Sequence, residues 1–172
     1  MTAAFFQEIS LILILFFAAL SDLRSRRVSN FLLAAGGVLI LLLRLLEGIQ
    51  PACLSLFWAV LVLLISQPIY RCGMAGAADI KMVVLIIACC PDGKGLLILL
   101  LAALSGGFCA LLRLLRGRLW KRRLQHLMWY VGQLQLGKRP KYYLYERDGE
   151  EASFPLAGFF LFGAVLGFGI LQ

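Results

Sequence analysis

The chain has 172 residues, of which 62% are hydrophobic and only 15% are charged, and its formal net charge is +8. Soluble domains carry about 45–50% apolar and about 25% charged residues, so this composition excludes a soluble globular protein and predicts a chain in contact with membrane lipid. We attribute the excess of basic residues to loops that set the membrane topology rather than to nucleic-acid binding. A single domain over residues 1–172 is expected.

Six apolar segments are predicted to form transmembrane helices, at approximately residues 3–21, 31–49, 52–70, 75–91, 95–115 and 154–171. A helix of about 20 residues covers a hydrocarbon core of about 30 Å. The fourth segment has only 17 residues, and it contains Asp79, whose carboxylate costs about 2.5–3.5 kcal/mol inside a bilayer. We therefore predict an all-α integral membrane protein in which Asp79 has a function that offsets this cost.

Lysine and arginine are distributed very unequally between the loops. Residues 22–30, 71–81 and 116–152 hold three, two and nine of them, whereas the loops of the other side hold only Lys94. Because basic loops stay in the cytoplasm, both chain termini are predicted to lie outside. Within the cytoplasmic loop 116–152, apolar residues recur at helical spacing from Trp120 to Leu134, which indicates an amphipathic helix at the membrane interface.

Two aspartates are predicted to lie on the cytoplasmic side at similar depth, since Asp22 closes the first segment and Asp79 opens the fourth. By itself Asp22 is more typical of a boundary residue paired with a neighbouring arginine. Asp79 follows a glycine-rich turn, and Lys81 is two residues away, a spacing that does not share a helix face. Two acids at one depth, in segments almost free of other acids, indicate a shared task.

Two juxtaposed carboxylates suit peptide hydrolysis. Like charges at close range cannot both ionise easily, so such a pair holds one proton. The ionised member can then remove a proton from water, while the protonated member polarises the scissile carbonyl.

The residues around both aspartates resemble the signatures of type IV prepilin peptidases. The stretch D-L-R-S-R-R-V-S-N (22–30) is similar to the family's first aspartate motif, and G-A-A-D-I-K-M (76–82) resembles its second. The stretch S-F-P-L-A-G-F-F-L-F-G (153–163) is similar to the entry of the family's last helix. Ala78 and Ser29 stand where the family motifs have glycine and proline, and the first two segments are joined by a short loop, as in the peptidase-only branch that serves tight-adherence (Flp-type) pili.

This resemblance implies an aspartic endopeptidase in a prokaryotic cytoplasmic membrane, with its active site facing the cytoplasm. Asp22 and Asp79 would be the catalytic pair, and no metal or other cofactor would be needed. The substrate would be a prepilin or pseudopilin, cut between its short basic leader and its hydrophobic helix. Gly76, Ala78, Lys81 and Asn30 would support the motifs or contact the substrate.

Some alternatives remain at the level of sequence. A non-enzymatic assembly subunit would use the aspartates for helix packing, and a proton-coupled transporter would use Asp79 as a proton carrier, although transporter charges lie more often near the bilayer midplane. Lys81 would extend to the interface or act on Asp79 through its charge. Asn30 would cap the second helix or contact the active site. Arg44 and Glu47 are predicted to form an ion pair.

Overall fold

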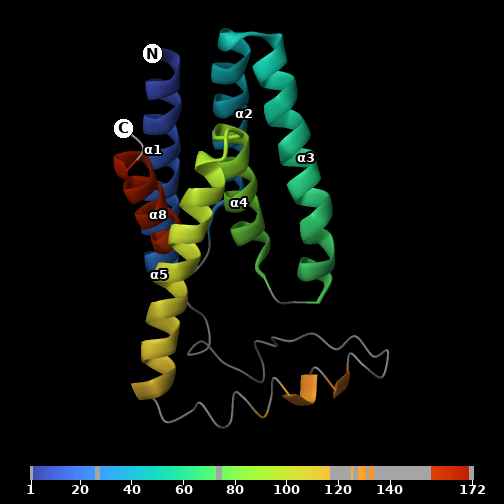
Figure 1. Ribbon diagram of the computed structural model, residues 1–172, viewed down its shortest axis with the longest axis vertical. Helices are drawn as coiled ribbons and strands as arrows, with labels where there is room; N and C mark the ends of the chain where they lie inside the picture. The colour runs from blue at the N-terminus through green and yellow to red at the C-terminus, as the bar shows by residue number, and fades with distance from the viewer. Residues whose placement is uncertain are drawn as a thin grey trace.

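The computed structural model describes residues 2–25, 28–72, 75–116 and 156–170, together with Gln125, 128–130 and 132–133 as short pieces. In these residues the chain forms six long helices and no strand (Figure 1). The helices are α1 (Thr2–Ser25), α2 (Asn30–Glu47), α3 (Ile49–Arg71), α4 (Ala77–Cys89), α5 (Lys94–Arg116) and α8 (Ala157–Ile170).

Each of the six predicted apolar segments largely coincides with one of these helices, so the prediction of an all-helical protein is confirmed for the described residues. Four helices are long and apolar enough to cross a membrane, namely Phe5–Ser25, Asn30–Glu47, Ile49–Arg71 and Lys94–Arg113. The other two are shorter, with 13 residues in α4 and 14 in α8. Most of the predicted cytoplasmic loop 116–152, with its interfacial helix, lies outside the described residues.

The fourth helix is shorter than the predicted segment 75–91 by two residues at each end. Gly76 precedes the helix in an extended conformation, with φ −72° and ψ 151°, and the helix ends at Cys89. A turn follows over residues 91–93, where Pro91 cannot donate a helical hydrogen bond and Gly93 has a φ of 87°. The 13 residues of α4 therefore rise only about 20 Å.

The helices α2 and α3 form a hairpin because the chain reverses at Gly48. This residue has φ 139° and ψ 167°, a conformation essentially restricted to glycine. Pro51 then lies in the first turn of α3, where a missing backbone N–H costs nothing. The hairpin turn lies at the same end of the bundle as the start of α1, and α8 runs toward that end, whereas α1 ends and α4 and α8 begin toward the other end (Figure 1).

The short helix α4 occupies the centre of the bundle. It packs against α1, α2, α3, α5 and, less extensively, α8, while α8 lies between α1 and α5. This arrangement encloses a core of apolar side chains from α1, α2, α4, α5 and α8. Among its most buried members are Leu11, Leu15, Ile40, Met82, Ile86, Ile98 and Ala164.

Much of the outer surface is also apolar, as a lipid environment requires. Exposed apolar side chains occur along every long helix, and Phe31, Leu46 and Ile49 are among the most exposed, at 82%, 83% and 75%. A soluble monomer rarely shows apolar patches of more than a few hundred Å². The chain is therefore a multi-pass membrane protein.

The contact between α5 and α8 depends on Gly163, and its replacement by alanine is expected to destabilise the bundle. A β-carbon at this position would lie 2.5 Å from the carbonyl oxygen of Ile98 and 2.9 Å from the backbone nitrogen of Ala102. Overpacking of this kind costs about 1–3 kcal/mol. The Gly169→Ala variant is the matched control, because a β-carbon there meets no atom within 4 Å. We expect a lower midpoint of thermal unfolding in detergent for Gly163→Ala alone. Equal midpoints would show that α5 and α8 can move apart at this contact without loss of stability.

Candidate active site

Asp22 lies near the end of α1 with its side chain half-buried. Its carboxylate Oδ2 accepts a hydrogen bond from the backbone N–H of Ala157, over 3.4 Å. Ala157 is the first residue of α8, so the N–H belongs to the unpaired donors that every helix has at its start. The partial positive charge of a helix N-terminus favours a carboxylate, and α8 therefore orients Asp22.

Asp79 is the third residue of α4 and is also half-buried. Its carboxylate Oδ2 turns back and accepts a hydrogen bond from the backbone N–H of Gly76, over 3.2 Å. An acidic side chain at this position stabilises the start of a helix in the same way. Asp79 therefore lies in the first turn of α4, held at the start of the helix. The predicted segment, which began at residue 75, would have placed one full turn of helix before it.

The structure brings the two aspartates together. The helices that carry them, α1 and α4, pack against each other, and the two aspartates lie within electrostatic range of each other. Both carboxylates thus lie where one helix ends and two others begin. Each Oδ2 accepts a hydrogen bond from a different helix N-terminus. Within the part of the chain that the structure describes, the Oδ1 atoms have no such partner and can take a ligand or a proton. Such a pair can act on a water molecule and a carbonyl group at once.

Lys81 and Asn30 lie close to each other, and Lys81 follows Asp79 by two residues in α4. The Lys81 Nζ donates a hydrogen bond to the Asn30 Oδ1 over 2.7 Å, which joins α4 to the start of α2. Ser29, not Asn30, is the N-cap of α2, so the predicted capping role of Asn30 is wrong. This contact links two helices. Extension of Lys81 to the interface and an effect of its charge on Asp79 stay predictions.

Gly76 and Ala78 differ in their surroundings. A β-carbon at Gly76 would lie 3.0 Å from the Asp79 Oδ2, which is closer than ordinary van der Waals contact, so glycine leaves the room that this carboxylate uses. Ala78 packs against the apolar core. Its methyl group therefore occupies space at the helix entrance that the glycine of the family motif would leave open.

One contribution to the site was missed by the sequence analysis, namely the backbone N–H of Ala157. A backbone donor leaves no signal in the residue types. The only available indication was that residues 153–163 resemble the family's last-helix entry, which placed a helix start near Ala157 without assigning it a contact. Residues 153–155 of this stretch lie outside the described residues.

Comparisons with known proteins identify the family. A search of curated proteins and a search of solved structures each returned no match. A family model, the type IV leader peptidase family, matches residues 9–111. The match covers more than half of the chain and includes α2, α3 and α4, the greater part of α1 and α5, and both aspartates. This chain therefore belongs to the type IV leader peptidase family and is a membrane-associated peptidase.

Proposed function

We propose that this protein is an aspartic endopeptidase that removes the short basic leader from prepilins or pseudopilins at the cytoplasmic face of the membrane. The observation that supports this proposal most directly is the convergence of Asp22 and Asp79 from two packed helices. Within a family of leader peptidases, this pair offers the acid and base that hydrolysis of a peptide bond needs.

The proposed reaction needs one proton shared by the two carboxylates. The ionised aspartate takes a proton from water, and the water oxygen attacks the scissile carbonyl carbon while the protonated aspartate donates to the carbonyl oxygen. The tetrahedral intermediate then collapses, the carbon–nitrogen bond breaks, and the leaving nitrogen takes a proton from the pair. The N–H groups of Gly76 and Ala157 would hold the two carboxylates in place during both steps.

The same proposal includes the topology. Six crossings would require α4 and α8 to be completed by the residues that flank them, since the helices themselves have 13 and 14 residues. Both termini would lie outside a prokaryotic cytoplasmic membrane, and residues 1–172 would form one domain. In support, the start of α1 and the α2–α3 turn share one end of the bundle, and α8 runs toward that end (Figure 1).

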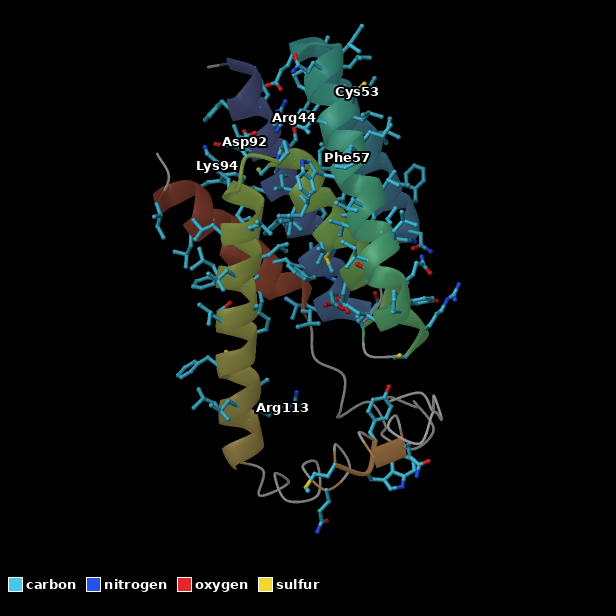
Figure 2. The ribbon with its side chains drawn as sticks, turned by 45° about the vertical axis from the view of Figure 1, so that its right-hand side comes forward. Arg44, Cys53, Phe57, Asp92, Lys94 and Arg113 are labelled. Atoms are coloured by element: carbon cyan, nitrogen blue, oxygen red, sulfur yellow. The ribbon has the colours of Figure 1, made fainter. Side chains whose placement is uncertain are left out.

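Two labelled charges illustrate how the ends of the bundle would face the two compartments. Lys94 begins α5 near Asp92 and Arg44, whereas Arg113 lies toward the other end of the same helix (Figure 2). Lys94 forms an ion pair with Glu8 of α1 over 3.3 Å. Lys94 is the one basic residue of the proposed outer loops, against 14 in the proposed cytoplasmic loops, and an excess of this kind is typical of the cytoplasmic side.

The function is tested by co-expression of this protein with candidate prepilins and by measurement of leader removal as a shift on a gel. The substrate should lose its leader only when the peptidase is present. Mass spectrometry of the product should place the cut between the basic leader and the hydrophobic helix. A full panel of prepilins that stays uncut in the presence of well-folded protein would contradict the proposal.

A Gly76→Ala variant is expected to cleave prepilin about 10- to 100-fold more slowly, because a misplacement of about 1 Å in a catalytic group costs this much. The added β-carbon would meet the Asp79 Oδ2 at 3.0 Å and displace the carboxylate. The control is Gly107→Ala on α5, where a β-carbon has no neighbour within 4 Å. Initial rates of both variants in proteoliposomes check the prediction, and equal rates would show that the carboxylate does not depend on this space.

A further inference from the structure

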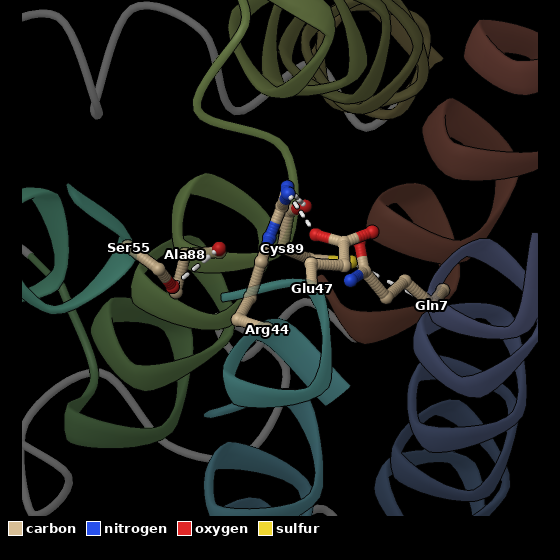
Figure 3. Close-up of polar contacts among 6 residues, drawn as sticks. All are labelled: Gln7, Arg44, Glu47, Ser55, Ala88 and Cys89. Carbon is tan, nitrogen blue, oxygen red and sulfur yellow. Dashed lines mark hydrogen bonds and ion pairs between the residues drawn. The ribbon is translucent and has the colours of Figure 1, made fainter. Parts of the chain in front are cut away.

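A cluster of polar side chains surrounds the end of α4 that lies away from Asp79. Two backbone carbonyls of this helix end accept hydrogen bonds from other helices (Figure 3). The Ser55 Oγ of α3 donates to the carbonyl oxygen of Ala88 over 2.7 Å, and the Arg44 guanidinium of α2 donates to the carbonyl oxygen of Cys89. The predicted ion pair of Arg44 with Glu47 is confirmed, with a distance of 2.9 Å.

A third contact connects the same helix end to α1. The Cys89 thiol donates a hydrogen bond to the backbone oxygen of Gln7 over 3.6 Å, and both residues are buried. The end of α4 is thus linked to α1, α2 and α3 by Gln7, Arg44 and Ser55. We call these three residues, together with Glu47, the α4 end cluster.

The short length of α4 explains why these donors are needed. The last four carbonyl groups of a helix have no partner within it, and in a bilayer no water is available to satisfy them. An arginine in an apolar segment costs at least about 2.5 kcal/mol. The side chain of Arg44 is nevertheless only 11% exposed and is directed at the helix end and Glu47. Its charge is therefore used to hold α4 at one position along the bundle.

This position determines where Asp79 lies. Asp79 and Cys89 belong to one uninterrupted helix, and ten residues of helix span about 15 Å. A helix transmits a shift of its end along its axis, because its backbone hydrogen bonds keep its length constant. Asp22 lies on a different helix, α1. Any sliding or tilting of α4 would therefore change the geometry of the two carboxylates.

We infer that Arg44 and Ser55 are positioning residues of the peptidase, which anchor the far end of α4 and thereby set the separation of Asp22 and Asp79. They act on the end of α4 that lies about 15 Å along the helix axis from Asp79, and their hydrogen bonds go to the carbonyl oxygens of Cys89 and Ala88. The inference rests on the proposed function, because it assigns the anchors a part in the same reaction.

The first test measures the separation of the two aspartates without using activity. Asp22→Cys and Asp79→Cys are introduced together after the five native cysteines have been replaced by serine, which keeps a donor at residue 89. A short bifunctional thiol reagent then reports how often the two positions meet. We expect Arg44→Met and Ser55→Ala to lower the cross-linked fraction at least about twofold, as discrete shifts of a helix change side-chain proximity, and Arg44→Lys to restore part of it.

The matched controls are Arg113→Met and Ser105→Ala. Arg113 is an exposed arginine of an apolar helix, and the Ser105 Oγ donates to the Ala102 carbonyl within its own helix over 3.1 Å. These variants remove a guanidinium group and a serine hydroxyl, as the test variants do, but from positions that donate no hydrogen bond to the end of α4. The cross-linked fraction of both should stay at the level of the parent protein.

The second test measures cleavage with both aspartates present. We expect kcat to fall about tenfold or more in Arg44→Met and Ser55→Ala, since misplaced catalytic groups lose rate, while KM stays within about twofold because substrate binding is not altered. Arg44→Lys should recover part of kcat. If the cross-linked fraction and kcat both stay unchanged while only the unfolding temperature falls, Arg44 and Ser55 merely stabilise the fold and the inference is overturned. Absence of cleavage by the unmodified protein would instead overturn the proposed function.

Discussion

Replacement of Asp22 or Asp79 by asparagine is expected to reduce leader cleavage by about 10³-fold or more, because each member of the pair contributes a proton transfer worth about 10²–10⁴-fold. Asparagine keeps the size of the side chain and an oxygen that can accept a hydrogen bond. The contacts to Ala157 and Gly76 should therefore survive, and the variants should accumulate in the membrane at normal levels. The substitution removes the negative charge of the carboxylate and its ability to exchange a proton.

The matched control for this experiment is Asp92→Asn. Asp92 is an exposed aspartate in the turn between α4 and α5, at the other end of α4 from Asp79 (Figure 2). Its replacement removes one negative charge without touching the pair, so cleavage should be unchanged. Initial rates with a purified prepilin in proteoliposomes decide the matter. Near-normal turnover by Asp22→Asn or Asp79→Asn would refute the assignment of these residues as the catalytic pair. If a chelator inhibited cleavage and added zinc restored it, the protein would be a metallopeptidase.

A cysteine at position 50 is expected to react completely with an impermeant thiol reagent on intact cells, whereas a cysteine at position 125 should not react at all. Gln50 lies at the start of α3 beside the α2–α3 turn, and both glutamines are exposed. The nine basic residues of 116–152 predict that position 125 stays in the cytoplasm. A bilayer blocks the reagent, so the expected contrast is all or none.

The labelling experiment uses Gln50→Cys and Gln125→Cys, each in a background without the native cysteines. Permeabilised cells provide the control, since both positions should then react to the same extent and show that neither thiol is buried. The opposite pattern, with position 125 reactive on intact cells and position 50 protected, would place the aspartate pair outside. Cleavage at the cytoplasmic face would then be impossible.

The sequence by itself was sufficient to locate the helices and to select the aspartates. Apolar segments between polar loops predicted all six helices, because the hydrophobicity of a segment is a local property. Two motifs around Asp22 and Asp79 indicated the family, which the match over residues 9–111 confirms. The ion pair of Arg44 and Glu47 was also predicted, since residues three apart on a helix are neighbours.

Only the tertiary structure revealed the length of α4, its place in the bundle and the hydrogen bonds that fix its end. The donors to its last carbonyls come from residues 33 and 45 positions away along the chain, and the N–H that binds Asp22 comes from 135 positions away. Such contacts depend on which helices become neighbours, and apolar segments of similar composition do not specify their neighbours. The register of Asp79 against Asp22 is therefore set by packing and by buried hydrogen bonds, which arise only when the bundle is assembled.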